Sequence, residues 1–341
     1  MTPRHRHITV FAVLSAVSAL LFAICLLVGT VDIPPRQVIN ALTGQPVEKM
    51  AWEVIVVDAR LPMCVTATLA GAALAVAGLL LQTTFDNPLA GPSILGISTG
   101  ASLGVAVVML AFGGIVATGA GVYAGTLAGA IAGAAVIMAV LLLFSSVVKS
   151  AVMLLIVGIM VGYLASSVIS LLNFFATQEG VHSFVIWGLG NFSSVTLDRL
   201  GVFAPVILVC LGLSMLLVKP LNALLLGTRY AESLGLNIRR TRNRLLLVSG
   251  ILTAVVTAFC GPIGFIGLVV PHVARLALRS SNHHILLPAT MLAGAATGLL
   301  CTLLSVLPSK GVIPINAITP VIGVPVIIYI IVCRKRVLYF N

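Results

Sequence analysis

A serine between two glycines is the pattern that comes nearest to a catalytic motif in this 341-residue sequence. Gly96, Ser98 and Gly100 match G-x-S-x-G, which in serine hydrolases presents a nucleophilic serine on a sharp turn between a strand and a helix. That turn needs a preceding strand and a partner histidine, whereas this segment lies inside an apolar run of membrane-helix length. We interpret it as a small-residue contact between helices.

Three histidines are the side chains that could bind a metal. His283 and His284 are adjacent in a predicted basic loop, and no acidic residue accompanies them or His272. Metal sites usually combine spaced histidines with cysteines or carboxylates, so structural or interfacial roles are favoured. The phosphate-binding pattern G-x-x-x-x-G-K-[ST] is also missing from the sequence. We therefore expect no catalytic residue, bound cofactor or metal in this chain.

The composition is that of a membrane protein. Hydrophobic residues make up 60% of the sequence, charged residues 8%, and the mean hydropathy is +1.20. The surface of a soluble domain could not be solvated with so few polar groups. The net charge of +11 does not indicate nucleic-acid binding, because the basic residues lie between apolar runs instead of on one face. The six cysteines are scattered and are interpreted as small buried side chains.

We predict an all-α polytopic membrane protein with about ten transmembrane helices in a single permease domain, residues 1–341. The expected spans are residues 8–29, two spans within 60–112, then 123–148, 153–174, 200–218, 245–260, a short span after 261–267, then 285–306 and 318–332. The first run is longer than a signal-peptide core and is expected to be retained.

Basic residues alternate with the spans. They concentrate at Arg4 and Arg6, in the loop 219–244, and at Arg334, Lys335 and Arg336, whereas most acidic residues lie in the segments 30–59 and 175–198. The positive-inside rule then places both termini and the loop 219–244 in the cytoplasm.

The second span combines a small-residue face with a polar break. Gly71, Ala72, Ala75 and Gly78 recur at helical spacing and would let another helix approach closely. The run stops at residues 86–88, where Pro88 has no amide hydrogen and disfavours helical geometry at the residue before it. Irregular backbone at membrane depth is tolerated only inside protein or beside water, so this elbow is a candidate for a transport path.

A weak similarity between two segments of the chain suggests an inverted repeat. Arg60 precedes a small-residue span that ends in Asn-Pro-Leu, and Arg244 precedes another that ends in Gly-Pro-Ile-Gly. The charge pattern makes these two spans run in opposite directions, as in transporters with inverted repeats. Two glycine- and alanine-rich spans that look alike by chance are an equally good explanation.

Several segments together resemble one family. They are RLP (60–62), GAALAVAG (71–78), Gln82, NPLAGPSILGISTGA (87–101), LNALLLGTRYAESLGL (221–236), CGPIGFIGLVVPHVAR (260–275) and VIGVPV (321–326). In order and spacing they are similar to the permease subunits of ABC importers for iron–siderophore, haem and vitamin B12, the FecCD type. The similarity extends from about Arg60 almost to the end of the chain.

The resemblance implies a type II ABC importer permease fold, with two permease copies forming a dimer. Two separate ATPase subunits, which hold ATP and Mg²⁺, would bind the inner face. A periplasmic or lipid-anchored binding protein would deliver a metal chelate from outside. The chain would then be a multi-pass protein of the bacterial inner membrane and a homodimer.

Matching positions imply three sets of site residues. Asn87, Leu89, Ser150 and Ala151 would form a cytoplasmic gate. Leu225, Gly227, Arg229, Ala231, Glu232, Leu234 and Gly235 would form short helices, broken at the glycines, that couple to the ATPase, with Leu225, Ala231 and Leu234 free to enter its groove. The alternative for this loop is an amphipathic stretch on the lipid headgroups. Arg60 would be an exposed outer cation that docks the binding protein.

The sequence also departs from the family pattern. Met63 stands where the family usually has a second arginine, and Thr302 and Val306 stand where it has an aspartate and an arginine. The family's Glu-Leu-Pro-x-Gly is replaced by the residues from Val312 to Asn316. Fewer charges are therefore expected where the binding protein docks.

We predict alternating access driven by ATP turnover in the partner chains, with a metal chelate passing a largely neutral wall. Such a wall suits haem, a corrinoid or a siderophore. An ion-coupled secondary transporter is the alternative, but it would usually carry an ionisable residue at mid-membrane, and no suitable Asp or Glu is present. A membrane enzyme ranks third because no acid–base set is evident.

Overall fold

The computed structural model describes residues 3–111, 120–148, 150–307 and 311–333, and the regular secondary structure within these ranges is entirely helical. The predicted end of the third span at residue 112 and the basic residues Arg334, Lys335 and Arg336 lie outside them.

The ten predicted spans correspond to ten apolar helical stretches in the described residues. Seven are long enough to cross a membrane: α1 (Pro3–Leu27), α4 (Leu61–Thr84), α6 (Ala120–Val147), α7 (Ala151–Phe175), α9 (Leu197–Leu216), α12 (Ile238–Cys260) and α14 (His283–Val306). The shorter ones are α5 (Ile97–Ala106), which a π-helical turn at Val107–Ala111 extends, α13 (Ile266–Leu278) and α15 (Ile315–Cys333). The prediction of an all-α, multi-pass membrane protein is confirmed.

The connections are more helical than expected. They contain α2 (Pro35–Thr43), α3 (Met50–Val54), α8 (Gln178–Gly188), a 3₁₀ turn at Phe192–Ser194, α10 (Val218–Leu224) and α11 (Thr228–Ser233). A π-helical segment at Ile55–Arg60 joins α3 to α4, so Arg60 lies inside one helix from Met50 to Thr84 and not at the start of a span. Likewise α12 begins at Ile238, so the basic run 239–244 is helical.

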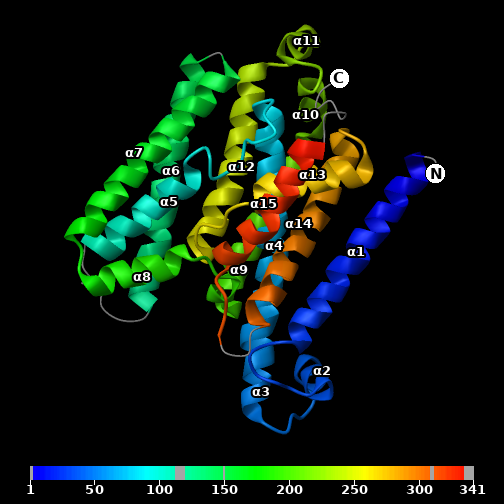
Figure 1. Cartoon of the computed structure of the whole chain (residues 1–341), viewed down its shortest axis with the longest axis vertical. Helices are drawn as coiled ribbons and strands as arrows, with labels where there is room; N and C mark the ends of the chain where they lie inside the picture. The colour runs from blue at the N-terminus through cyan, green and yellow to red at the C-terminus, as the bar shows by residue number, and fades with distance from the viewer. Residues whose placement is uncertain (1–2, 112–119, 149, 308–310, 334–341) are drawn as a thin grey trace.

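The two ends of the helix bundle differ in character (Figure 1). The start of α1, helices α10 and α11, and the basic first turns of α12 lie at one end, which we call the basic end. Helices α2 and α3 lie at the opposite end. Because α4 runs between the two, its last residues and the elbow that follows them lie at the basic end.

Close helix contacts occur at the predicted small-residue face of α4. A Cβ atom on Gly71 would overlap the carbonyl oxygen of Gly294 on α14, and one on Gly78 would overlap that of Gly267 on α13. Glycine at these positions brings the helix backbones into direct contact, where dispersion forces and complementary shape hold helices together in a membrane. The interpretation of this face as a packing surface is confirmed.

The packing of the central helices is reciprocal. Helices α4 and α12, the second spans of the two halves of the chain, pack against each other. Helix α4 also packs against α13 and α14 of the second half, and α12 packs against α5 and α6 of the first half. This exchange is what an inverted repeat predicts, and it favours a true repeat over a chance similarity of two spans.

Candidate functional site

A cavity of about 400 Å³ opens beside the start of α5, and five of its ten lining residues carry hydroxyl groups. Its walls come from the connection between α4 and α5, from α5 and α7, from the connection between α12 and α13, and from the start of α15. The lining residues are Ser93, Ser98, Thr99, Ser102, Ser166, Ile169, Pro262, Ile263, Gly264 and Asn316. None of these residues is charged. The wall therefore offers weak hydrogen bonds and apolar contact, but no fixed counter-charge for an ion.

The serine of the G-x-S-x-G pattern belongs to this wall. Ser98 lies in the first turn of α5, and its hydroxyl accepts a hydrogen bond from Thr257 Oγ1 at 3.4 Å. A Cβ on Gly100 would lie 2.7 Å from the carbonyl oxygen of Gly133 on α6. The segment is a helix in tight contact with another helix, as interpreted from the sequence, and not the strand-to-helix turn of a hydrolase.

The chain breaks after α4 as the sequence predicted. Asp86 has φ +47°, in the left-handed region, and Leu89 N donates a hydrogen bond of 2.9 Å to Asn87 Oδ1. Partial burial raises the pKa of the Asp86 carboxyl above its ordinary value. A left-handed Gly96, φ +77°, then begins α5. Leu89 is exposed, so the elbow presents an apolar side chain at the basic end.

The second predicted pair of gate residues lies on a separate segment. Ser150 caps the start of α7 by accepting a hydrogen bond of 3.4 Å from Met153 N, and Ala151 follows it. The end of α6, just before this start, is held to α12 because Arg242 donates to the carbonyl oxygens of Ser145 and Val148, at 2.6 and 2.8 Å. The gating role of both pairs stays a prediction.

Helix α13 holds the elbow in place. The Gln82 side chain, at the end of α4, donates to Leu268 O at 3.1 Å and accepts from Arg275 Nη1 at 2.7 Å. His272 Nε2 lies 2.8 Å from Pro88 O, and it must donate because a carbonyl oxygen can only accept. His272 therefore fastens the elbow to α13.

His283 fastens a second helix to the same place. It begins α14 instead of lying in a loop, and its ring lies between Asn222 Oδ1, 2.9 Å from Nδ1, and Thr83 Oγ1, 2.9 Å from Nε2. Among the described residues, no group of three or more His, Cys, Asp or Glu side chains has the arrangement of a metal site. The roles of His272 and His283 are thus hydrogen bonds within the chain, a pattern that sequence alone could not reveal.

The loop 219–244 contains the short helices that were predicted. Gly227 and Gly235, with φ of +92° and +85°, flank α11 and break the helical structure. Tyr230 and Leu234 are 56% and 60% exposed, and Leu226 just before α11 is 59% exposed. Arg229 and Glu232 are also exposed.

One expectation for this loop is wrong. Ala231 is fully buried within its own chain, so it is not free to enter a groove on another protein, and Leu225 is only partly exposed. On a short amphipathic helix one face must pack against the protein, and Ala231 lies on that inner face. The exposed apolar side chains of Leu226, Tyr230 and Leu234 are the ones available to a partner.

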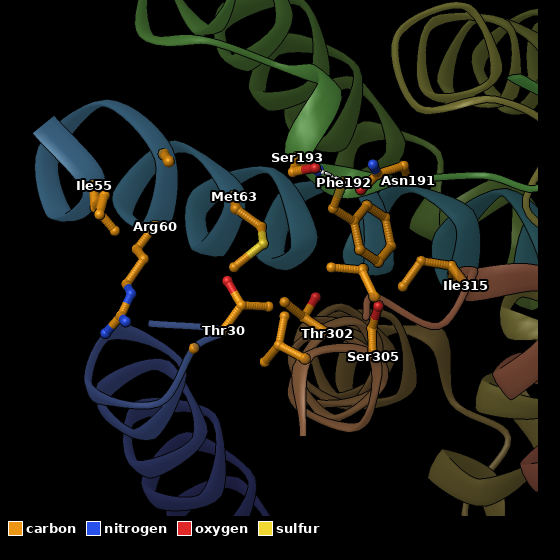
Figure 2. Close-up of a pocket in the computed structure, with 14 residues that line it drawn as sticks. Thr30, Ile55, Arg60, Met63, Asn191, Phe192, Ser193, Thr302, Ser305 and Ile315 are labelled. Atoms are coloured by element: carbon orange, nitrogen blue, oxygen red, sulfur yellow. Dashed lines mark hydrogen bonds between the residues drawn. The ribbon is translucent and has the colours of Figure 1, made fainter. Parts of the chain in front are cut away.

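A second hollow of about 200 Å³ lies toward the opposite end of the bundle (Figure 2). It is lined by Gly29, Thr30, Ile55, Ala59, Arg60, Met63, Asn191, Phe192, Ser193, Thr302, Ser305, Val306, Val312 and Ile315. The departures from the family pattern at Met63, Thr302, Val306 and Val312 gather here. Met63 is thus brought next to three positions that lie more than 200 residues later in the sequence, and the four together make one neutral surface.

The expectation that Arg60 is exposed is wrong, because its side chain is only 4% exposed. Figure 2 shows it reaching toward the end of α1. The guanidinium group donates to Leu26 O at 2.9 Å, to Leu27 O at 2.8 Å, and to Val31 O. The last carbonyls of a helix lack partners within the helix, and Arg60 supplies donors for those of α1. Its docking role stays a prediction.

Asn316 is a site residue that the sequence analysis did not single out. Its side chain donates to Gly188 O at 3.0 Å and to Pro262 O, and it accepts from Gly264 N at 3.2 Å. It thereby ties the start of α15 to two connections at the edge of the cavity of about 400 Å³. A lone polar side chain in an apolar stretch was the available clue.

Comparisons with known proteins agree with this architecture. Residues 17–333 match the model of the FecCD transport family. The vitamin B12 import system permease protein BtuC of Klebsiella pneumoniae is 35% identical over 319 residues, which cover 93% of this chain and 90% of that protein. The hemin transport system permease protein HmuU of Yersinia pestis is 34% identical over 278 residues, 81% and 83% of the two chains. A solved structure assigned as an inward-facing conformation of a metal-chelate type ABC transporter superposes with a TM-score of 0.81 at 30% identity, over 96% and 99% of the chains.

Proposed function

The chain belongs to the FecCD transport family, and from that premise we propose that it is the permease subunit of an ATP-driven importer that moves a metal chelate into the cytoplasm by alternating access. Haem, a corrinoid such as vitamin B12 and an iron–siderophore are the substrate classes in question.

The observation that carries this proposal is the neutral cavity beside the start of α5, where five hydroxyl-bearing residues lie among apolar ones. A path for a bulky chelate must let it pass without a tight site, and serine and threonine hydroxyls with apolar neighbours provide such a wall. An ion-coupled secondary transporter would instead need an ionisable group facing the path, and none of the described residues that line this cavity is ionisable.

The partners follow from the two ends of the bundle. The basic end would face the cytoplasm, with both termini inside, and two ATPase subunits that hold ATP and Mg²⁺ would bind the exposed side chains around α11. The binding protein would approach the opposite end from outside. Because Ser93 and Ser166 of the cavity are exposed on the surface, a second copy of this chain would complete the path as a homodimer in a bacterial inner membrane.

Transport into proteoliposomes tests this function. The chain is purified together with its ATPase and reconstituted with the binding protein, and haem, cobalamin and a ferric siderophore are offered in turn. We expect uptake of one chelate that requires ATP and Mg²⁺ and persists after ionophores collapse the ion gradients. Uptake that stops when the gradients collapse at constant ATP would favour the ion-coupled alternative.

Shortening both elbow side chains should open the proposed gate. In the double variant Asn87→Ala and Leu89→Ala, the hydrogen bond between Asn87 Oδ1 and Leu89 N is lost and an exposed apolar side chain is removed. We expect a chelate loaded into proteoliposomes to leak out without ATP. Leu42→Ala is the control, because Leu42 is 40% exposed on α2 at the opposite end, against 45% for Leu89. If the double variant leaks chelate no faster than this control, Asn87 and Leu89 do not form the gate.

A charge at the residue that follows α11 should weaken binding of the ATPase. Leu234→Glu places a carboxylate where an apolar side chain would be buried by the partner, and losing such a central contact typically costs about 2 kcal/mol or more. We expect at least a ten-fold weaker affinity, about 1.4 kcal/mol per factor of ten, in a pull-down or by light scattering. Ile39→Glu on α2 is the control, since Ile39 is 58% exposed at the opposite end. If both variants bound the ATPase with equal affinity, the ATPase would not bind at Leu234.

A further inference from the structure

We propose that Asn222, His283 and Thr83 form a hydrogen-bonded connection that transmits movement of the loop 219–244 to the proline elbow, with Thr83 as the positioning residue at the elbow. The connection rests on the proposed function, because the loop is where the ATPase is proposed to act.

The three residues come from three helices that the sequence separates widely. Asn222 lies on α10 within the loop, His283 is the first residue of α14, and Thr83 is next to the last residue of α4. Asn222 Oδ1 accepts from His283 N at 2.8 Å and lies 2.9 Å from its Nδ1, while His283 Nε2 lies 2.9 Å from Thr83 Oγ1. His283 is fully buried and Thr83 is 5% exposed, so water does not compete for the bond between these two side chains.

The donors and acceptors available on each group determine the direction of each hydrogen bond in the connection. Because Asn222 Oδ1 already accepts from the His283 backbone N–H, it also acts as acceptor for the ring, and Nδ1 must carry a hydrogen. In the neutral imidazole, Nε2 is then an acceptor, and the Thr83 hydroxyl donates to it. Thr83 Oγ1 also lies 3.1 Å from Leu79 O in its own helix. A shift of α10 that withdraws the His283 ring lets this hydroxyl turn back to Leu79.

Both ends of the connection continue into the segments that must move. At the elbow, Asp86 N donates to Thr83 O at 3.4 Å and Asn87 N donates to Gln82 O at 3.1 Å. On the loop side, Asn222 Nδ2 donates to Asn282 Oδ1 at 3.0 Å. Asn282 caps α14 by accepting from His284 N, also at 3.0 Å. Displacement of α10 therefore acts on α14 and on the end of α4 together, which is the kind of contiguous network that can couple two sites.

The neighbouring threonine provides a matched control. Thr84 is 9% exposed on the same helical turn, and its hydroxyl donates to Leu80 O at 2.6 Å, as that of Thr83 can donate to Leu79 O. The hydrogen bond to His283 belongs to Thr83. Thr83→Val and Thr84→Val thus remove the same atoms from the same end of α4, but Thr83→Val alone removes a contact with His283. Thr83→Ser keeps the hydroxyl and serves as the rescue.

The experiment follows the elbow and transport in the complex with the ATPase and binding protein. Leu89→Cys, with Cys333 replaced by serine, reports the elbow through its rate of reaction with a maleimide, because the other five cysteines are buried. Transport is measured separately, in chains that keep Leu89. In the parent, ATP should change this rate. With Thr83→Val we expect ATPase binding and hydrolysis to persist, while the ATP-dependent change in rate and the chelate transported per ATP fall about five-fold or more, a typical coupling between two sites. Thr84→Val and Thr83→Ser should behave like the parent.

The possible results distinguish failure of this connection from failure of the proposed function. An ATP response and transport ratio in Thr83→Val equal to those in Thr84→Val would overturn the connection while leaving the proposed function intact. A parent that neither binds an ATPase nor responds to ATP would instead overturn the proposed function. If Thr83→Val does not insert, Asn222→Ala tests the other end of the connection, where the side chain is partly exposed, and the same loss of response is expected.

Discussion

Replacing Gly78 with alanine will force α4 away from α13 and leave little stable protein. A Cβ at this position would overlap the carbonyl oxygen of Gly267, and it would lie 2.8 Å from the Gly267 Cα. These are backbone atoms, which cannot rotate away as the end of a flexible side chain can. Overpacking typically costs about 1–3 kcal/mol and occasionally more, and a clash between two helix backbones belongs at the upper end of that range.

The effect of Gly78→Ala is measured as thermal stability in detergent by size-exclusion chromatography after heating. Gly212→Ala is the matched control, because Gly212 lies on α9 and a Cβ there would meet nothing within 4 Å. Alanine in a helix interior is favoured over glycine by roughly 0.5–1 kcal/mol, so this control should be neutral or slightly stabilising. Similar losses in both variants would mean that close contact between α4 and α13 is not required.

The second large effect is expected from Arg60→Met. Methionine keeps an unbranched apolar stem but leaves the carbonyl oxygens of Leu26, Leu27 and Val31 without the guanidinium donors. Hydrogen bonds to charged groups contribute about 1.5–3 kcal/mol each, and a positive charge at the end of a helix also complements its dipole. We expect a marked drop in melting temperature, with partial recovery in Arg60→Lys, which restores the charge but not the planar fork.

This prediction separates a structural role of Arg60 from a docking role. An exposed ion pair with a binding protein contributes only about 0.2–1 kcal/mol and weakens with salt. Arg36→Met is the control, since Arg36 is exposed on α2 at the same end. Arg60 would have a docking role if Arg60→Met melted at the same temperature as this control and also showed a salt-dependent loss of affinity for the binding protein.

Much of the fold could be predicted because its causes are local. Apolar runs of span length and the alternation of basic loops follow from how each segment partitions between lipid and water, so ten spans could be placed before any contact was known. The breaks at Pro88, Gly227 and Gly235 were equally predictable, since proline and glycine restrict or free the backbone within a few residues. The small face of α4 was visible as a periodicity of glycine and alanine.

The environment of single side chains was decided by the tertiary structure. Arg60 looked like a free outer cation, yet its partners are carbonyls 29 to 34 residues earlier in the chain. Ala231 looked available to a partner, but the packing of α11 turns it inward. His283 looked like a loop residue, and its role depends on Asn222 and Thr83 of two other helices.

The same holds for the surfaces that several segments share. Met63, Thr302 and Val312 were three separate departures from a family pattern until the structure brought them into one hollow. A sequence shows which faces of its helices are small enough for close contact, but many apolar spans in this chain carry such faces. Which pairs actually meet depends on the complementary shapes of surfaces hundreds of residues apart, as for Gly71 and Gly294, and that choice is made only when the helices pack.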